Sequence, residues 1–199
     1  MEYLLSTSPD NFEKRALALF HHQYQNVSVY RSYADLVHRN HPKKLNEIPF
    51  LPISFFKTAR IIDQESLNID LHFQSSGTGN SGRSQHFVLD KQWYDDSFSS
   101  GFTHFFGPVE EYVVLALLPN YVDQGDSSLV YMVNALIQQS KQELSGFLLH
   151  DPSSLIERYR AAVSQGKKVI IFGVSYTLLD LAELNIDLSE AIIIETGGM

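Results

Sequence analysis

The sequence predicts an α/β protein in which helices and a glycine-loop β-hairpin precede a largely parallel βαβ sheet. From Tyr112 onward, short apolar runs alternate with segments whose apolar residues recur at helical spacing. Strands that alternate with helices form parallel sheets covered on both faces. Upstream, two helical patterns lead to a glycine-rich segment that lies between two short, strand-like runs.

The bulk composition is that of an acidic globular protein. Of the 199 residues, 44% are hydrophobic and 19% are charged, and the formal net charge is −8. Nucleic-acid backbones bind clustered Lys and Arg, so this negative charge argues against a general nucleic-acid binder. It is compatible with a local basic pocket that holds one nucleotide. The absence of cysteine excludes disulfides, thiolate zinc sites and a cysteine nucleophile within these residues. No apolar run has membrane-spanning length and the N-terminus has no signal-peptide pattern, so we expect a cytoplasmic protein without a membrane partner.

Two helices are expected near the N-terminus. Ser8-Pro9-Asp10 has the order of an N-cap, a proline at the first helical position and an acid in the first turn. A second helix is expected over 27–39, packed beside the first. The apolar face of the first helix consists of Phe12, Ala16, Leu19 and Phe20. Surface or packing roles, rather than metal binding, are expected for His21, His22, His38 and His41.

The run Ile48–Lys57 is strongly apolar and contains two prolines. Proline inside a helix removes a hydrogen bond and clashes with the preceding turn, so no regular helix is expected here. The two interpretations are an ordered loop over a core and one wall of an apolar pocket.

The segment Ser75–Ser84 combines three glycines, several hydroxyls and one cation within ten residues. Glycines permit positive φ and a close approach of a ligand to the backbone, and successive amides in such a turn form a nest for anions. Arg83 can hold a phosphate through two parallel hydrogen bonds. The flanking runs, 69–73 and 85–89, have the pattern of strands, so we expect a phosphate-binding loop carried by a hairpin. The alternative is an ordinary polar hairpin tip.

A nucleotide P-loop is a second interpretation of this loop. The spacing from Gly77 to Ser84 fits G-x-x-x-x-G-K-[ST] with Arg83 in place of the lysine, and Ile192–Glu195 has the pattern of the acid-ended strand of such enzymes. Two features oppose this interpretation. A P-loop passes directly into a helix, whereas residues 86–89 have the pattern of a strand. Arg83 would also place a bulky, forked guanidinium where a P-loop has the compact ammonium group of lysine.

The remainder of the chain is expected to supply the sheet and its helices. Strands are expected over 112–118, 146–149, 168–172 and 191–194, and helices over 129–137, 152–163 and 176–184. Asp90 and Asp151-Pro152 are expected to start helices. The helix after Asp90 has an aromatic stripe formed by Trp93, Tyr94, Phe98, Phe102 and Phe105. Ligands of such sheets bind at the carboxyl ends of the strands, where Phe172–Ser175 and Glu195–Gly198 stand.

Three motifs resemble those of one enzyme superfamily. Ser75-Ser76-Gly77-Thr78 resembles the Ser-Ser-Gly-Thr-Thr-Gly phosphate loop of the adenylate-forming acyl- and aryl-CoA synthetases, with Gly79 and Asn80 departing from that pattern. Ile48–Ile53 with Phe56-Lys57, and the terminal Glu195–Met199, look like the acyl-protein synthetase branch, which includes the fatty-acid ligase of bacterial bioluminescence. The motifs follow one another in the family's order and span residue 48 to the end of the chain.

The resemblance implies an AMP-forming acid–thiol ligase that uses ATP and Mg²⁺. In that chemistry a fatty or aryl carboxylate attacks the α-phosphate of ATP, and the acyl group of the resulting acyl-adenylate passes to a thiol of coenzyme A or of an acyl-accepting protein. Gly197 and Gly198 would lie along the adenine ring, and Val174, Ser175 and Tyr176 would border the acyl pocket. The loop residues that would hold the phosphates are Ser75, Ser76, Gly77, Thr78, Gly79 and Arg83.

We expect the chain to be the N-terminal part of the large domain of such an enzyme, with a helical lead-in over 1–45 and a nucleotide- and acyl-binding part over 46–199. It ends right after a strand, where a loop that lines a site would begin. The family's tyrosine-glycine-x-threonine-glutamate motif, ribose-binding aspartate, catalytic lysine and acyl-accepting cysteine have no counterpart in these residues. No catalytic residue or metal ligand is therefore assigned. Three alternatives stay open: a P-loop-like phosphotransferase, a non-catalytic nucleotide- or acyl-binding module, and a fragment without activity of its own.

Overall fold

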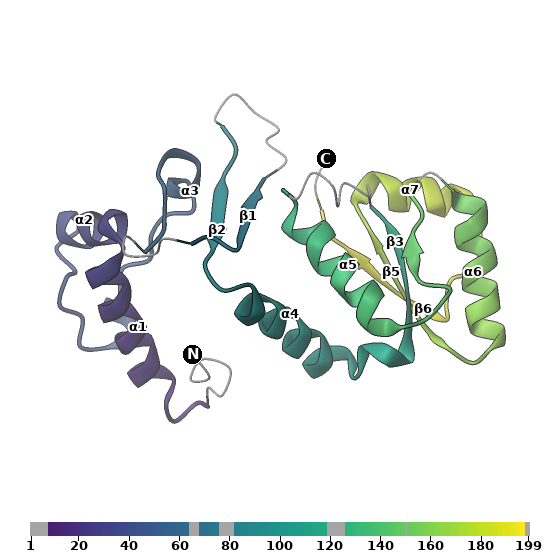
Figure 1. Cartoon of the computed structure of the whole chain (residues 1–199), viewed down its shortest axis with the longest axis horizontal. Coiled ribbons are helices and arrows are strands. Elements are labelled where there is room, and N and C mark those ends of the chain that lie inside the picture. Colours follow the sequence, from purple (N-terminus) through teal and green to yellow (C-terminus); the bar gives the residue numbers. More distant parts are fainter. Residues whose placement is uncertain (1–7, 64–67, 76–81, 119–125, 150, 198–199) are drawn as a thin grey trace. The chain divides into compact units, whose positions relative to one another are not determined.

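The computed structural model describes residues 8–63, 68–75, 82–118, 126–149 and 151–197. The chain divides into two compact units, Met1–Ser97 and Phe98–Met199, and the expected lead-in over 1–45 lies wholly inside the first. Figure 1 labels the elements. In the first unit they are α1 (Phe12–Asn26), α2 (Ser28–Leu36), η1 (Leu45–Glu47), α3 (Phe55–Thr58), β1 (Leu71–Gln74) and β2 (Gln85–Val88). Helix α4 (Lys91–Phe106) crosses the boundary. The second unit continues with η2 (Val109–Glu111), β3 (Tyr112–Leu117), α5 (Ser128–Ser140), β4 (Gly146–Phe147), α6 (Pro152–Ser164), β5 (Lys168–Gly173), α7 (Ser175–Glu183) and β6 (Ala191–Glu195).

The first two helices pack against each other around a small core of Phe20, Ala34 and Ile48. Tyr30 extends this core and donates its hydroxyl hydrogen to the carbonyl of Pro49 over 2.7 Å. That bond ties the start of the proline-containing run to α2. Residues 48–54 contain no helix or strand, as the two prolines predict. At the end of the run the expectation is wrong, because the one-turn helix α3 begins at Phe55, three residues after Pro52.

The ends of both helices differ from the sequence-based expectation. Ser8-Pro9-Asp10 was expected to start α1, and this is wrong: Ser8 and Asn11 form a turn, closed by the Ser8 N–H to Asn11 Oδ1 bond of 2.9 Å, and the helix begins at Phe12. Helix α2 ends at Leu36 rather than at residue 39, because His38 adopts a positive φ of 55°. The amide of Arg39 then bonds to the carbonyl of Ala34, which closes the helix end with the hydrogen bonds of a Schellman motif.

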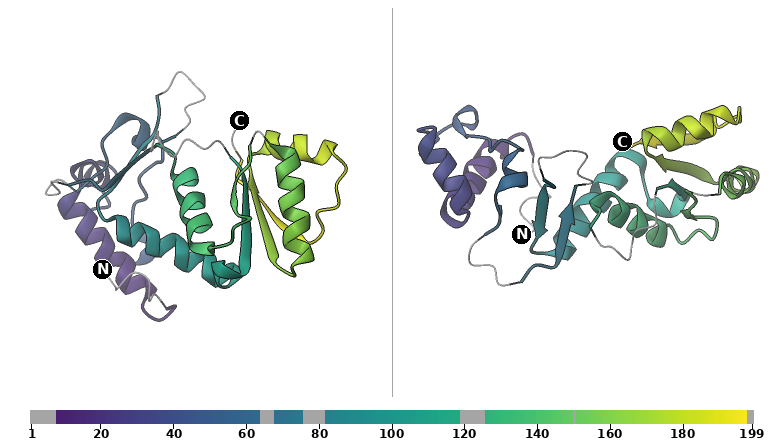
Figure 2. Two further views of the ribbon diagram at one scale, coloured as in Figure 1. Left: turned by 45° about the vertical axis from the view of Figure 1, so that its right-hand side comes forward. Right: turned by 90° about the horizontal axis from the view of Figure 1, so that it is seen from above.

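The second unit contains a four-stranded parallel sheet in the order β4-β3-β5-β6. Helices cover both of its faces (Figure 2). On one face Val114, Ala116 and Phe172 pack with Val133 and Leu136 of α5. On the other, residues of the same strands pack with α6 and α7, including Val113, Leu115, Ile171, Leu155, Tyr159 and Leu181. The α/β class and the largely parallel sheet are confirmed, and within the described residues the one antiparallel pair is β1–β2.

All six residues of β3 are buried, so its backbone groups need partners inside the protein. Strand β5 pairs along its whole length, but β4 begins only opposite Leu115. The amide of Val114 is bonded instead by the hydroxyl oxygen of Ser145, at 2.9 Å. Ser140 donates its own hydrogen to Ile137 O, so the 3.0 Å contact between the two hydroxyls has Ser145 as donor. Three consecutive hydrogen bonds, from Val114 to Ser145 to Ser140 to Ile137, therefore satisfy the backbone of β3 where β4 does not pair with it.

Two aspartates start helices as the sequence predicts. The Asp90 carboxylate accepts the amide of Trp93, and the Asp151 carboxylate accepts that of Ser154, both at 2.9 Å. The aromatic stripe of α4 is buried only in part: Phe102 lies in the core, whereas Phe105 is 78% exposed. None of the helices in the described ranges is both long and apolar enough to cross a membrane.

Replacing Ser145 by alanine should destabilise the protein. The variant leaves the amide of Val114 without its 2.9 Å partner at a fully buried position. An unsatisfied buried donor costs about 1–3 kcal/mol. Urea unfolding should show this loss, whereas Ser164→Ala, which removes an exposed hydroxyl bonded to Ala161 O, should change stability little. Equal unfolding midpoints for the Ser145 variant and the native sequence would contradict the hydrogen-bond chain.

The Asp151 cap predicts a pH-dependent contribution to stability. Hydrogen bonds from the Ser154 hydroxyl and amide, followed by the charge of Arg158, hold the pKa of Asp151 below the usual 3.8. A carboxyl whose pKa is lowered by folding stabilises the fold above its unfolded pKa, and this contribution is lost as the pH falls through the folded value. The melting-temperature difference between the native sequence and Asp151→Asn should therefore be positive near neutral pH and shrink below about pH 4. A difference that stays constant down to about pH 2 would contradict this role of the carboxylate.

Candidate functional site

The carboxyl ends of β3 and β5 form the topological switch point of the parallel sheet. The chain passes from β3 to β4 on one side and then to β5 on the other side of β3. The connections after β3 and β5 therefore leave in opposite directions, and in open α/β sheets ligands bind in the crevice formed at such a point. Val174 and Ser175 follow β5 directly and begin α7 (Figure 1).

Gly173 and Thr177 hold the start of α7 against the sheet. A Cβ at Gly173 would lie 2.6 Å from Leu178 Cδ2, so only glycine permits this close packing of helix on strand. The buried hydroxyl of Thr177 lies 2.9 Å from the carbonyl of Val174 and 3.2 Å from that of Leu117, the last residue of β3. The two carbonyls share its one hydrogen, and this bifurcated hydrogen bond links the start of α7 to the end of β3.

Ser175 and Glu195 form a hydrogen-bonded pair at this edge. The Ser175 hydroxyl donates to Glu195 Oε1 over 2.5 Å, which joins the first residue of α7 to the last residue of β6. The carboxylate thereby lies beside the N-terminus of α7, whose first turn contains no acid of its own. Negative charge is stabilised there by the helix dipole.

The end of β6 is also bonded to the end of β5. Thr196 donates both its amide and its hydroxyl hydrogen to the carbonyl of Gly173, at 3.0 and 3.2 Å. Gly197 follows with a positive φ of 62°, so the backbone turns away from the strand at a residue without a side chain. The predicted site residues Ser175 and Gly197 are thus brought to one edge of the sheet.

The neighbouring predicted residues have different environments. Val174 packs against the core of Phe172 and Val114, whereas Tyr176 is half exposed on the first turn of α7. Gly198 lies outside the described residues. The edge as described has the carboxylate of Glu195 and the hydroxyls of Ser175 and Thr196, which donate their hydrogens within the protein and so offer mainly acceptors to a ligand. Such a surface suits the hydroxyl and amino groups of a ligand better than its phosphates.

The second candidate site is the base of the glycine loop in the first unit. Leu71–Gln74 pairs antiparallel with Gln85–Val88, so the loop joins the two strands of a hairpin. Ser75 and Ser84 close its base through two 3.0 Å bonds: the Ser75 amide donates to Ser84 O, and the Ser84 amide donates to the Ser75 hydroxyl. Gly82 has a positive φ of 77°, and Arg83 beside it is exposed. The predicted phosphate-binding residues Ser76, Gly77, Thr78 and Gly79 lie outside the described residues.

The P-loop interpretation requires a helix that starts directly after the loop. Residues 85–88 are a strand instead, and residues 82–84 have no helical structure. The geometry of a P-loop is therefore absent from the described part of this segment, and the expected hairpin is present.

No group of three or more His, Asp or Glu residues in the described ranges is arranged to hold a metal ion. Mg²⁺ commonly binds through substrate phosphates with only one or two carboxylates from the protein. Glu195 is the carboxylate that the described residues place at the switch-point edge.

No family model, curated protein or solved structure matches this chain.

The sequence analysis singled out both strand ends but missed the role of Thr177. Its hydroxyl is on the buried side of α7, where helical spacing predicts an apolar residue. A polar residue at such a position, directly after a strand, is the signal that was available. Its partner on β3 lies 60 residues away in the chain, so the sequence contained no indication of which carbonyl it would meet.

Adding a methyl group at Gly173 should disturb this edge. The Cβ would lie 2.6 Å from Leu178 Cδ2 and 2.7 Å from its Cγ, so the Leu178 side chain must move. Overpacking of this kind costs about 1–3 kcal/mol. A matched control is Gly101→Ala in α4 of the same unit, where a Cβ meets nothing within 4 Å. That change should stabilise the helix by about 0.5–1 kcal/mol. The melting temperature should fall for Gly173→Ala and rise for Gly101→Ala. A Gly173→Ala variant as stable as the native protein would contradict the close packing.

Proposed function

We propose that this chain supplies nucleotide- and acid-binding surfaces for the ATP-dependent activation of a carboxylic acid. The reaction is attack of a carboxylate oxygen on the α-phosphorus of ATP, which breaks the bond to pyrophosphate and leaves an acyl-adenylate. A thiol sulfur then attacks the acyl carbonyl and releases AMP. The protein must hold two anions in line and neutralise charge that develops on the phosphates.

The observation that carries this proposal is the hairpin geometry of the glycine loop. A loop of this composition, with three glycines and several hydroxyls and a base closed by the Ser75–Ser84 bonds, would offer amides and hydroxyls to an anion. The strand that follows it separates this arrangement from a P-loop and agrees with the adenylate-forming pattern that its sequence resembles. Ser75, Ser76 and Thr78 would bind the β- and γ-phosphates, with Arg83 as the cation.

The switch-point edge of the second unit is the surface that we propose for the nucleoside and the acid. Its acceptor-rich surface suits a nucleoside, with Gly197 beside the adenine ring because a residue without a side chain leaves the ring face open. Ser175 and Tyr176 would border the acid. Mg²⁺ bound to the ATP phosphates supplies charge neutralisation at the reacting phosphorus. The chain's own contribution is to bind and orient.

The test is Mg-ATP binding measured by titration calorimetry. Thr78→Ala should weaken binding at least tenfold, about 1.4 kcal/mol, because it removes a hydroxyl from the phosphate loop. Ser164→Ala, which removes an exposed hydroxyl at the end of α6, is the matched control and should bind as the native chain does. Equal binding by the Thr78 variant would remove the loop from the site.

Catalysis is tested separately, by carboxylate-dependent exchange of pyrophosphate into ATP with octanoate and benzoate. The family's catalytic lysine and ribose-binding aspartate have no counterpart in these 199 residues, so the chain alone should bind ATP without measurable exchange. A longer gene product that contains the chain should exchange, and Thr78→Ala should slow it at least tenfold. ATP binding with no exchange in any product would favour the non-catalytic binding module.

A further inference from the structure

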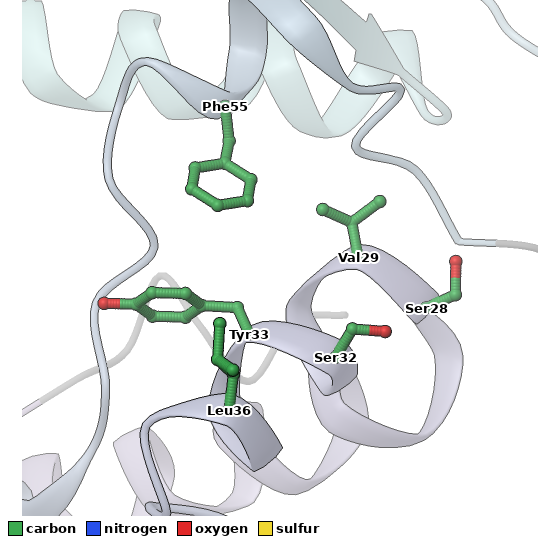
Figure 3. Close-up of a pocket in the computed structure, with 6 residues that line it drawn as sticks. All are labelled: Ser28, Val29, Ser32, Tyr33, Leu36 and Phe55. Atoms are coloured by element: carbon green, nitrogen blue, oxygen red, sulfur yellow. The ribbon is translucent and has the colours of Figure 1, made fainter.

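A small apolar pocket lies between α2 and α3 in the first unit. Its volume is about 310 Å³, and it is lined by Ser28, Val29, Ser32, Tyr33, Leu36 and Phe55 (Figure 3). The first five residues share one face of α2, and Phe55 faces them from α3. Its volume is at the lower end of the range for small-molecule sites, about 300–1,000 Å³.

The walls of the pocket are apolar on three sides. The rings of Tyr33 and Phe55 meet edge to face, with centroids 5.7 Å apart, which fixes the distance between the two helices. Leu36 is 77% exposed, so this large apolar side chain is left mostly without packing. The hydroxyls of Ser28 and Ser32, one helical turn apart, lie beside Val29 (Figure 3). No lining residue is charged at neutral pH, so the pocket suits a neutral apolar group with one hydrogen-bonding end.

Helix α3 connects this pocket to the base of the glycine loop. While Phe55 lines the pocket, the next residue, Phe56, stacks on His86 of β2 with centroids 4.6 Å apart and planes 16° apart. A Cβ at Gly82 would lie 3.8 Å from the carbonyl of Lys57, so the end of the loop is in contact range of α3 as well. Helix α3 therefore contacts both the pocket and the hairpin that carries the glycine loop.

We propose that this pocket binds the alkyl or aryl part of a small molecule that carries a hydroxyl or similar group, and that α3 passes its occupancy to the glycine-loop hairpin. The inference goes beyond the proposed adenylation and does not depend on it. A small ligand fits the cavity volume, whereas a docked protein helix requires an interface on the order of 1,000 Å². The absence of charge in the lining distinguishes this occupant from a phosphate or an acidic peptide.

The binding test uses 1-octanol and 2-naphthol as probes of the two shapes, with amide chemical shifts of the full chain as the readout. Both probes should bind saturably and shift the amides of α2. Leu36→Gln should weaken binding at least fivefold, about 1 kcal/mol, because it replaces an apolar wall at an exposed position without disturbing the core. Leu179→Gln, at a leucine that is 67% exposed on α7, is the matched control and should bind like the native chain. No saturable binding, or equal binding by the Leu36 variant, would overturn the site.

The connection to the loop has its own test. The amide of His86 should shift with the same apparent affinity as the α2 amides when 1-octanol is added. Phe56→Leu removes the ring stacked on His86 but keeps an apolar side chain, so it should bind the probe within twofold of the native affinity and lose the His86 shift. A His86 shift that survives in this variant, or that is missing in the native chain despite binding, would overturn the role of α3.

Discussion

The arrangement of the second unit depends on the burial of β3 on both faces. A strand without solvent contact must pair all its backbone groups within the protein, so β5 covers it along six residue pairs and β4 along two. Where β4 has not yet begun, the hydroxyl of Ser145 takes the place of a strand at Val114. These pairings determine which strand ends are neighbours. They therefore place the carboxyl ends of β3, β5 and β6 at one edge of the sheet, and the positions of the switch-point residues follow from this pairing.

Local features were predictable because their interactions span only a few residues. Asp90 and Asp151 each accept the amide three residues further on, so the sequence around them contains both partners. The buried strand after Tyr112 is evident from its uninterrupted apolar run. The start of α1 was mistaken because Asn11, rather than Ser8, precedes the first helical residue. The end of α2 was mistaken because His38 adopts the left-handed conformation, where glycine is the usual residue.

The site was predictable only in part, since its contacts join distant residues. Periodicity placed Ser175 and Glu195 at strand ends, but it is the parallel register, with Gly173 opposite Glu195, that brings them within 2.5 Å. A register shift of one residue would turn Glu195 to the other face of the sheet. The exposure of Phe105 has the same origin: helical spacing identifies an apolar stripe, but only the neighbouring elements determine how far each residue is covered.

The two candidate sites differ in their electrostatics. A helix N-terminus at the carboxyl end of a parallel strand is an anion site in many α/β proteins. Here the carboxylate of Glu195 already lies at the N-terminus of α7, so it would repel a phosphate bound there. The glycine loop has the opposite character: the residues described at its end are Gly82 with positive φ and an exposed arginine. Because like charges repel and an arginine can bind phosphate through two bonds, a phosphate suits the glycine loop better than it suits the N-terminus of α7.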